Sequence, residues 1–139
     1  MNLGTEWLVD AEGCSAELLR DIETVRGVCE EVVSALTLRV VGEPVWHQFP
    51  QPGGVTGLYL LTESHLACHT FPETGKATFN LYCCRPRPRF DWEAVLQGSL
   101  NAKLVTVRTA ARGSEATIDQ ASLESELSTF SAAREVSGR

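Results

Sequence analysis

Positive charge is scarce in this sequence: 12 lysines and arginines stand against 18 aspartates and glutamates, and the net charge is −6. Proteins that bind nucleic acid through phosphate contacts carry basic surfaces, so this balance argues against such a partner. Long apolar runs are also missing, and none approaches the roughly 20 residues of a membrane span. The opening stretch MNLGTEWLVDAEG lacks a basic segment followed by an apolar one, so no secretory signal is evident. We expect a cytoplasmic protein with no membrane or nucleic-acid partner.

The five cysteines lack the spacing of a disulfide framework, because their number is odd and no CxxC occurs. Adjacent Cys83 and Cys84 would point to opposite faces of a strand. We interpret the set as reduced thiols. The run HLACH (65–69), with these cysteines nearby, raises the alternative of a zinc site, but four ligands at a familiar spacing are not evident. The sequence therefore predicts no bound metal.

Hydrophobic periodicity predicts an α+β fold, a two-layer sandwich of a mostly antiparallel sheet with two helices on one face. Ser15 and Asp91 are the expected N-caps of the two helices. Hairpin connections are expected near residues 63 and 73. Strands are predicted at 5–11, 39–49 (interrupted at 42–44), 55–62, 65–70, 76–84 and 103–109, and helices at 16–36 and 91–101. One domain is expected over residues 1–113, followed by a polar tail (114–139) whose composition fits either a loose helix or disorder.

Most of the chemical information lies in LTESHLACHTFPETGKATFNLYCC, residues 61–84. It contains Glu63-Ser64-His65, then His69-Thr70-Phe71-Pro72-Glu73, then Cys84. A lone serine here would be an ordinary turn residue, but the ordered set at this spacing is specific. The segment resembles the S-adenosylmethionine decarboxylase proenzymes of bacteria and archaea. The resemblance extends over roughly residues 3–113, with LVDAEGC, HQF, GGVTG and ARG as supporting pieces.

The resemblance implies an enzyme that makes its own cofactor by cleaving the chain between Glu63 and Ser64. The serine hydroxyl would attack the preceding carbonyl carbon, and elimination would follow. Hydrolysis would then leave a covalent pyruvoyl group, derived from Ser64, at the new N-terminus. By the same resemblance, Thr56 and His69 assist the processing, with His69 as the base for elimination.

For turnover, the resemblance implies that the pyruvoyl group forms a Schiff base with the substrate and accepts the electron pair released with carbon dioxide. Cys84 is the implied acid that reprotonates the product, and Cys83 would take its place if the alignment slipped by one residue. Phe49 and Phe71 are the implied aromatic contacts of the substrate. Glu73 matches a carboxylate that binds ribose hydroxyls. The implied reaction supplies decarboxylated S-adenosylmethionine, the aminopropyl donor of spermidine synthesis.

Several positions depart from the family pattern and raise other substrates. Phe71 lacks the polar tip that the family usually has there, and Thr74, Lys76 and Asn80 replace two aromatics and an acidic residue. A pyruvoyl-dependent ornithine or arginine decarboxylase on the same scaffold is therefore an alternative. A non-catalytic homologue that regulates a partner subunit is a second one, against which the intact catalytic set argues. The resemblance also implies a homodimer of processed protomers or a higher homo-oligomer.

Overall fold

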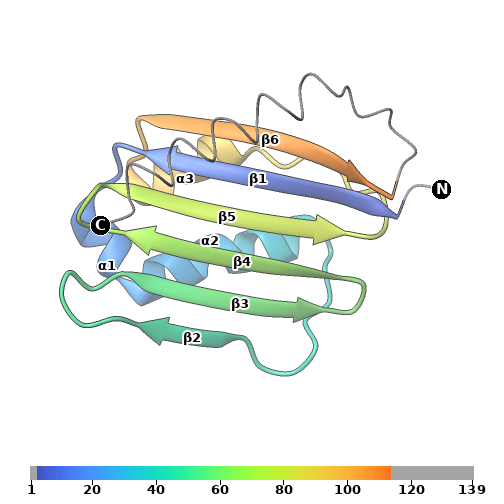
Figure 1. The fold of residues 1–139 in the computed structure, drawn as a ribbon, viewed down its shortest axis with the longest axis horizontal. Helices are drawn as coiled ribbons and strands as arrows, with labels where there is room; N and C mark the ends of the chain where they lie inside the picture. The colour runs from blue at the N-terminus through green and yellow to red at the C-terminus, as the bar shows by residue number, and fades with distance from the viewer. Residues whose placement is uncertain (1–2, 114–139) are drawn as a thin grey trace, which may run out of the picture.

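The computed structural model describes residues 3–113, in which six antiparallel strands form one sheet and three helices accompany it (Figure 1). The strand order across the sheet is β2-β3-β4-β5-β1-β6. The predicted α+β class is confirmed. The elements are β1 (Gly4–Glu12), α1 (Ala16–Arg20), α2 (Ile22–Ala35), β2 (Val45–Gln48), β3 (Val55–Leu61), β4 (Ser64–Phe71), β5 (Lys76–Cys83), α3 (Trp92–Leu100) and β6 (Leu104–Arg112). The tail predicted for residues 114–139 lies outside the described residues.

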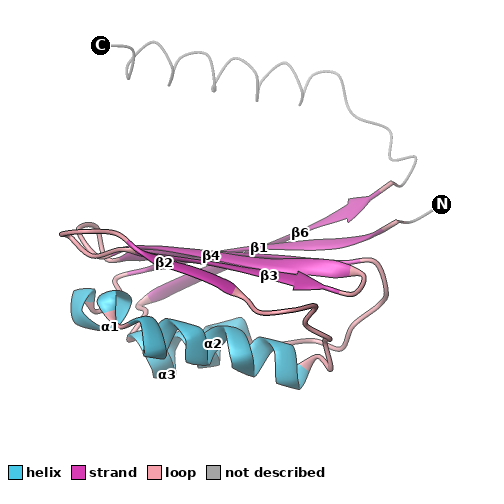
Figure 2. Cartoon of the chain, turned by 90° about the horizontal axis from the view of Figure 1, so that it is seen from below, coloured by secondary structure: helices cyan, strands magenta, loops and turns pink. Residues whose placement is uncertain are grey.

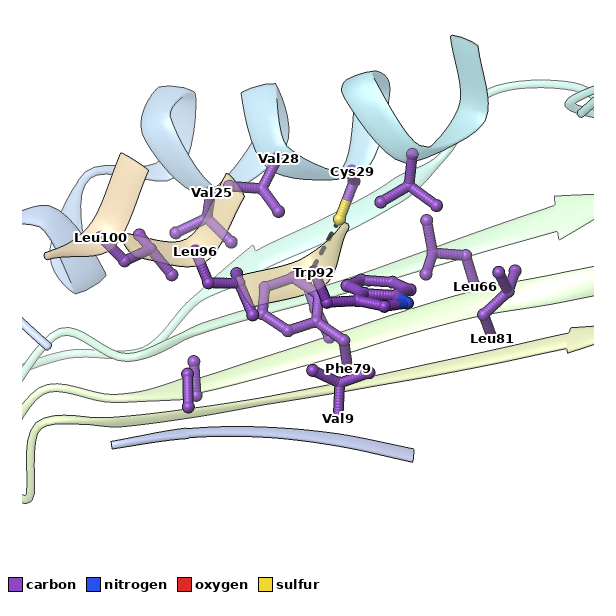
Figure 3. Close-up of a cluster of buried hydrophobic side chains, with 14 of the residues drawn as sticks. Val9, Val25, Val28, Cys29, Leu66, Phe79, Leu81, Trp92, Leu96 and Leu100 are labelled. Carbon is purple, nitrogen blue, oxygen red and sulfur yellow. Dashed lines mark hydrogen bonds between the residues drawn. The ribbon is translucent and has the colours of Figure 1, made fainter. Parts of the chain in front are cut away.

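All three helices lie on one face of the sheet, as predicted (Figure 2). Because side chains alternate along a strand, every second residue of β3, β4 and β5 points toward the helices and is buried. Figure 3 shows valines and leucines of α2 and α3 packed over the aromatic rings of Phe79 and Trp92. The buried hydroxyl of Thr70 fits this apolar layer because it donates to the Leu19 carbonyl oxygen and accepts from the Val55 N–H.

The opposite face of the sheet, which we call the open face, carries no described helix (Figure 2). Large apolar side chains lie exposed on its β3 strand, where Leu58 and Leu60 are 50% and 62% accessible. His69 and Phe71 of β4 point the same way, because they alternate with the buried Cys68 and Thr70. The open face is therefore an apolar surface that also displays candidate catalytic residues.

The single helix predicted for residues 16–36 is in fact two helices, separated at Asp21. This residue is extended, and its own N–H donates to the Leu18 carbonyl oxygen at the end of α1. Its carboxylate accepts from the Glu23 N–H (3.2 Å) and from the Thr24 hydroxyl (2.7 Å), which caps α2. The predicted caps Ser15 and Asp91 are confirmed, each accepting a backbone N–H three residues on.

The strand predicted for residues 39–49 is also shorter than expected. Only Val45–Gln48 pairs with β3, and Val40 makes an isolated bridge to Leu61. Gly42, with a φ of +70°, and Pro44 separate the two parts. The hairpins expected near residues 63 and 73 are present, joining β3 to β4 and β4 to β5. The first of them carries the predicted cleavage site.

Candidate active site

The peptide between Glu63 and Ser64 lies at the tip of the β3–β4 hairpin. Leu61 pairs with Ser64, so Thr62 and Glu63 form a two-residue turn. The Glu63 carbonyl oxygen accepts a hydrogen bond from the backbone N–H of Cys84, 3.2 Å away. This hydrogen bond polarises the carbonyl carbon that a neighbouring hydroxyl would attack. The Glu63–Ser64 peptide is thus held at the hairpin tip by the residue that follows β5.

The Glu63 side chain is held by Arg85, which follows the cysteines. The Arg85 Nη2 donates to one carboxylate oxygen at 2.8 Å, and its Nε contacts the other. Such a two-point contact fixes the orientation of both groups. The side chain of Glu63 is therefore fixed beside the segment that follows β5.

The two adjacent cysteines have different surroundings, as their alternation on a strand predicts. Cys83 is fully buried, pairs with Ser64 in the sheet and points toward the helices. Burial raises the pKa of the Cys83 thiol, and a hydrogen bond with Ser64 and the charge of Arg87 oppose that rise. Cys84 is exposed at the end of β5. Of the two thiols, Cys84 is the accessible one.

A second group of predicted residues surrounds a pocket of about 450 Å³ at the other end of β3 and β4. Thr56 and His69 face each other across these strands, and the Thr56 Oγ1 lies 3.0 Å from the His69 Nδ1. The rings of Phe49 and Phe71 and the carboxylate of Glu73 also line the pocket. The structure thus gathers five of the predicted site residues in one place.

The loop that carries Phe49 is fixed to helix α1 by side chains that sequence reasoning missed. The Arg20 Nε donates to the Pro52 carbonyl oxygen at 2.9 Å, and the Gln48 Nε2 donates to the Arg20 carbonyl oxygen at 2.6 Å. Glycine is required at Gly53, where φ is +86°, and at Gly54, where a Cβ would lie 2.6 Å from the Thr70 carbonyl oxygen. The GG of this loop therefore shapes the pocket wall.

The structure does not bring the two groups together within one chain. His69 lies five residues beyond Ser64 on β4, a separation of about 17 Å in extended strand. Ser64 and Cys84 are at the hairpin end, whereas Thr56 and His69 line the pocket at the other end. One chain therefore holds two half-sites rather than one complete site.

His65 takes part in a polar chain on the open face, not in either half-site. Its Nε2 lies 3.0 Å from the Asn80 Oδ1, and the Asn80 Nδ2 donates to a Glu6 carboxylate oxygen at 2.7 Å. This hydrogen bond lowers the pKa of Glu6, and the hydrogen bond and charge of Arg112 lower it further. Among residues 3–113 no three His, Cys, Asp or Glu side chains lie close enough to hold a metal ion. None of the helices in that range is long and apolar enough to cross a membrane.

Comparison with known proteins identifies the family. The family model described as S-adenosylmethionine decarboxylase matches residues 5–113. The S-adenosylmethionine decarboxylase proenzyme of Pelotomaculum thermopropionicum is 37% identical, with 81% of this chain and 88% of that protein covered. The proenzyme of Clostridium tetani is 36% identical, with 81% and 88% covered. The crystal structure of the adenosylmethionine decarboxylase of Aquifex aeolicus superposes with a TM-score of 0.66 at 29% identity, covering 86% of this chain and 98% of that one.

The fold and these comparisons together place the chain in the class of decarboxylase proenzymes. The chain belongs to the S-adenosylmethionine decarboxylase family.

Proposed function

We propose that this chain cleaves itself between Glu63 and Ser64 and then decarboxylates S-adenosylmethionine. The product is the aminopropyl donor for spermidine synthesis. The observation that carries the proposal is the hairpin itself, where the Glu63 carbonyl accepts the Cys84 N–H in a chain of this family. The acidic sequence also suits a cationic substrate, and the cytoplasm is the location we expect.

Processing begins when the Ser64 hydroxyl adds to the Glu63 carbonyl carbon and the peptide nitrogen leaves it, giving an ester. A base then removes the Cα proton of residue 64, and the oxygen departs with the Glu63 carboxylate. Residue 64 is left as dehydroalanine, and hydrolysis releases its nitrogen as ammonia. The Cys84 N–H supports the first step because it stabilises negative charge on the Glu63 oxygen.

His69 is the base that we propose for the elimination. If its Nδ1–H donates to the Thr56 Oγ1, 3.0 Å away, the Nε2 is left unprotonated and able to accept a proton. Thr56 thereby selects the tautomer and fixes the ring, which is the role of a positioning residue. Both side chains lie on the open face at a pocket wall, where a second molecule has access.

In the homodimer that we propose, the partner chain supplies the base that Ser64 lacks within its own chain. Because Ser64 and His69 of the same strand are about 17 Å apart, His69 cannot reach its own Ser64 without a break in β4. Ser64 alternates to the helix side of β4 and is reached at the hairpin end of the strand, so the twofold partner would have to bring its His69 to that end of the sheet. The exposed Leu58 and Leu60 on the open face would be buried in the same step.

The pyruvoyl group, once formed at residue 64, supplies an electron sink for decarboxylation. The residues present fit it, because Ser64 is half-buried at the hairpin and the Cys84 thiol is exposed beside it. Cys84 is the acid that we propose to protonate the product at Cα. A sulfonium placed over the Phe49 or Phe71 ring would gain about 0.5–2 kcal/mol, and Glu73 would accept hydrogen bonds from the ribose hydroxyls.

Intact mass under denaturing conditions tests the proposal first. We expect two chains, residues 1–63 and 64–139, with the second blocked by a ketone that reacts with hydrazides. The Ser64→Ala variant, which has no hydroxyl to attack, is the matched control and should stay whole. Release of carbon dioxide from carboxyl-labelled S-adenosylmethionine, but not from ornithine or arginine, then identifies the substrate. A wild-type chain that stays whole on long incubation would overturn the proposal.

A further inference from the structure

Three arginines surround the hairpin in a chain that is acidic as a whole. Arg39, Arg85 and Arg87 line a pocket of about 330 Å³ together with Thr37, Thr62 and Glu63. We call this the arginine pocket. Glu63 is the one carboxylate among these lining residues, so positive charge exceeds negative charge there before cleavage. Such an excess favours a second anionic group in the same place.

Each of the three arginines is held in the arginine pocket by a contact of its own. Arg85 binds the Glu63 side chain through two nitrogens. The backbone of Arg39 is fixed beside the turn, since its carbonyl oxygen accepts the Thr62 N–H at 3.0 Å. The Arg87 Nη1 donates to the Leu36 carbonyl oxygen at 3.4 Å. The contact partners lie in two parts of the chain, the hairpin turn with Thr62 and Glu63 and the end of α2 at Leu36.

Arg87 has unused hydrogen-bonding capacity. Its Nε is buried and has no hydrogen-bond partner among residues 3–113. A buried donor without an acceptor destabilises the protein, so an acceptor is expected in the mature protein. Arg87 and Glu63 line the same pocket, and Ser64 follows Glu63 directly in the chain. The guanidinium therefore lies in the pocket beside the peptide that is cleaved.

Cleavage makes an acceptor at this point. The ester places the Ser64 oxygen on the Glu63 carbonyl carbon, and elimination leaves that oxygen there as part of a new carboxylate. Its other oxygen is the former Glu63 carbonyl oxygen, which lies 3.2 Å from the Cys84 N. The carboxylate thus forms next to the Cys84 N–H, on a residue that lines the same pocket as Arg87.

We propose that Arg85 and Arg87 bind the new C-terminus at Glu63, with Arg85 on the side chain and Arg87 on the carboxylate that cleavage creates. The inference rests on the proposed self-cleavage. It assigns a function to the RPRPR segment (85–89). The cleaved end is kept in the arginine pocket, so that it stays clear of residue 64 and the open face.

A comparison of two backgrounds tests the inference. The wild-type background contains the new carboxylate after cleavage, and the Ser64→Ala background does not. We expect Arg87→Ala to lower the melting temperature by about 3 °C more in the cleaved background than in the uncleaved one. Arg87→Lys, which keeps the charge, should recover part of this difference. Arg89→Ala is the matched control, because Arg89 belongs to the same segment, is exposed and does not line the arginine pocket.

A second measurement, digestion with carboxypeptidase, probes the new C-terminus at Glu63 directly. Carboxypeptidase should remove Glu63 from the 1–63 chain several-fold faster in Arg85→Ala or Arg87→Ala than in wild type or Arg89→Ala, as read from the mass of that chain. Equal thermal losses in both backgrounds, with unchanged trimming, would overturn the inference while leaving self-cleavage intact. Arginine variants that stay whole would also overturn it, because they would place these residues before cleavage. An uncut wild-type chain would instead overturn the proposed function and this inference together.

Discussion

Two inactive variants, mixed together, test whether the active site is shared between chains. The Ser64→Ala chain keeps the base but has no residue to convert. The His69→Ala chain keeps Ser64 but lacks the base. A dimer of one chain of each kind would have one site with both residues intact and one site with neither. We therefore expect the His69→Ala chain to be cleaved after mixing, although it cleaves poorly alone.

The expected amount of cleavage in the mixture follows from the distance between Ser64 and His69 of one chain. Proton transfer requires heavy atoms roughly 3 Å apart, whereas Ser64 and His69 of one chain are separated by about 17 Å of strand. Loss of a general base slows a reaction by about 10²–10⁴-fold, so the His69→Ala chain alone should be almost entirely whole. In an equal mixture with random pairing, about half of the His69→Ala chains have a Ser64→Ala partner. About half of them should then be cleaved.

Intact mass provides the assay, with the two chains distinguished by tags of different mass and paired by co-refolding. The control mixture replaces Ser64→Ala with the double variant Ser64→Ala/His69→Ala, which has no base to contribute. The rescued cleavage should be absent there. The reasoning would be refuted if the mixed sample were no more cleaved than the control, or if His69→Ala alone were cleaved at the wild-type rate.

Three further predictions concern the pocket loop and the core. Arg20→Ala, by freeing the Pro52 carbonyl, should raise KM several-fold and leave kcat within about twofold, measured by steady-state kinetics against Arg26→Ala as control. The Cys68 and Cys29 sulfurs lie 3.7 Å apart in the core, so Cys68→Ser buries a hydroxyl there and should lower the free energy of unfolding in urea by about 1–3 kcal/mol. Cys84→Ser, at an exposed position, should lower it little. Burial raises the pKa of Cys83, so as the pH rises the thiol loses its proton in the unfolded chain before it does in the folded one. The free energy of unfolding should therefore fall above about pH 8.5. A urea midpoint that did not fall between pH 7 and 10 would contradict this.

Periodicity predicted most of the fold because the helices and strands each bury one regular face. It failed at Asp21, since the apolar spacing of residues 18–36 continues through a residue whose backbone is extended. Asp21 is a strong N-cap type, and that property was the available signal. In the strand predicted over 39–49, the interruption at 42–44 is confirmed, and the part before it was overextended, because only Val40 there makes a bridge to β3.

In the half-sites, residues close together in the sequence could be predicted, and contacts between distant residues could not. Ser64, His69 and Cys84 lie in one motif, so their order along the chain could be recognised. Arg20 contacts a residue 32 positions away, and Arg87 contacts one 51 positions away. No spacing rule connects such partners, because the topology of the sheet decides which loops meet. RPRPR was visible in the sequence, but its reach to the cleavage site was not.

The positions that depart from the family pattern bear on the substrate only if they reach the pocket. Lys76 pairs with Glu12 at 3.4 Å, and Asn80 bridges His65 and Glu6 on the open face. Thr74 hydroxyl donates to the Phe71 carbonyl oxygen within its turn. None of these three lines the 450 Å³ pocket, whereas Phe49, Phe71 and Glu73 do. Of the departures from the family pattern, Phe71 alone lines the pocket, and it keeps the aromatic ring there. A nucleoside cation needs a ring and an acceptor, and both are present, so the case for S-adenosylmethionine stands.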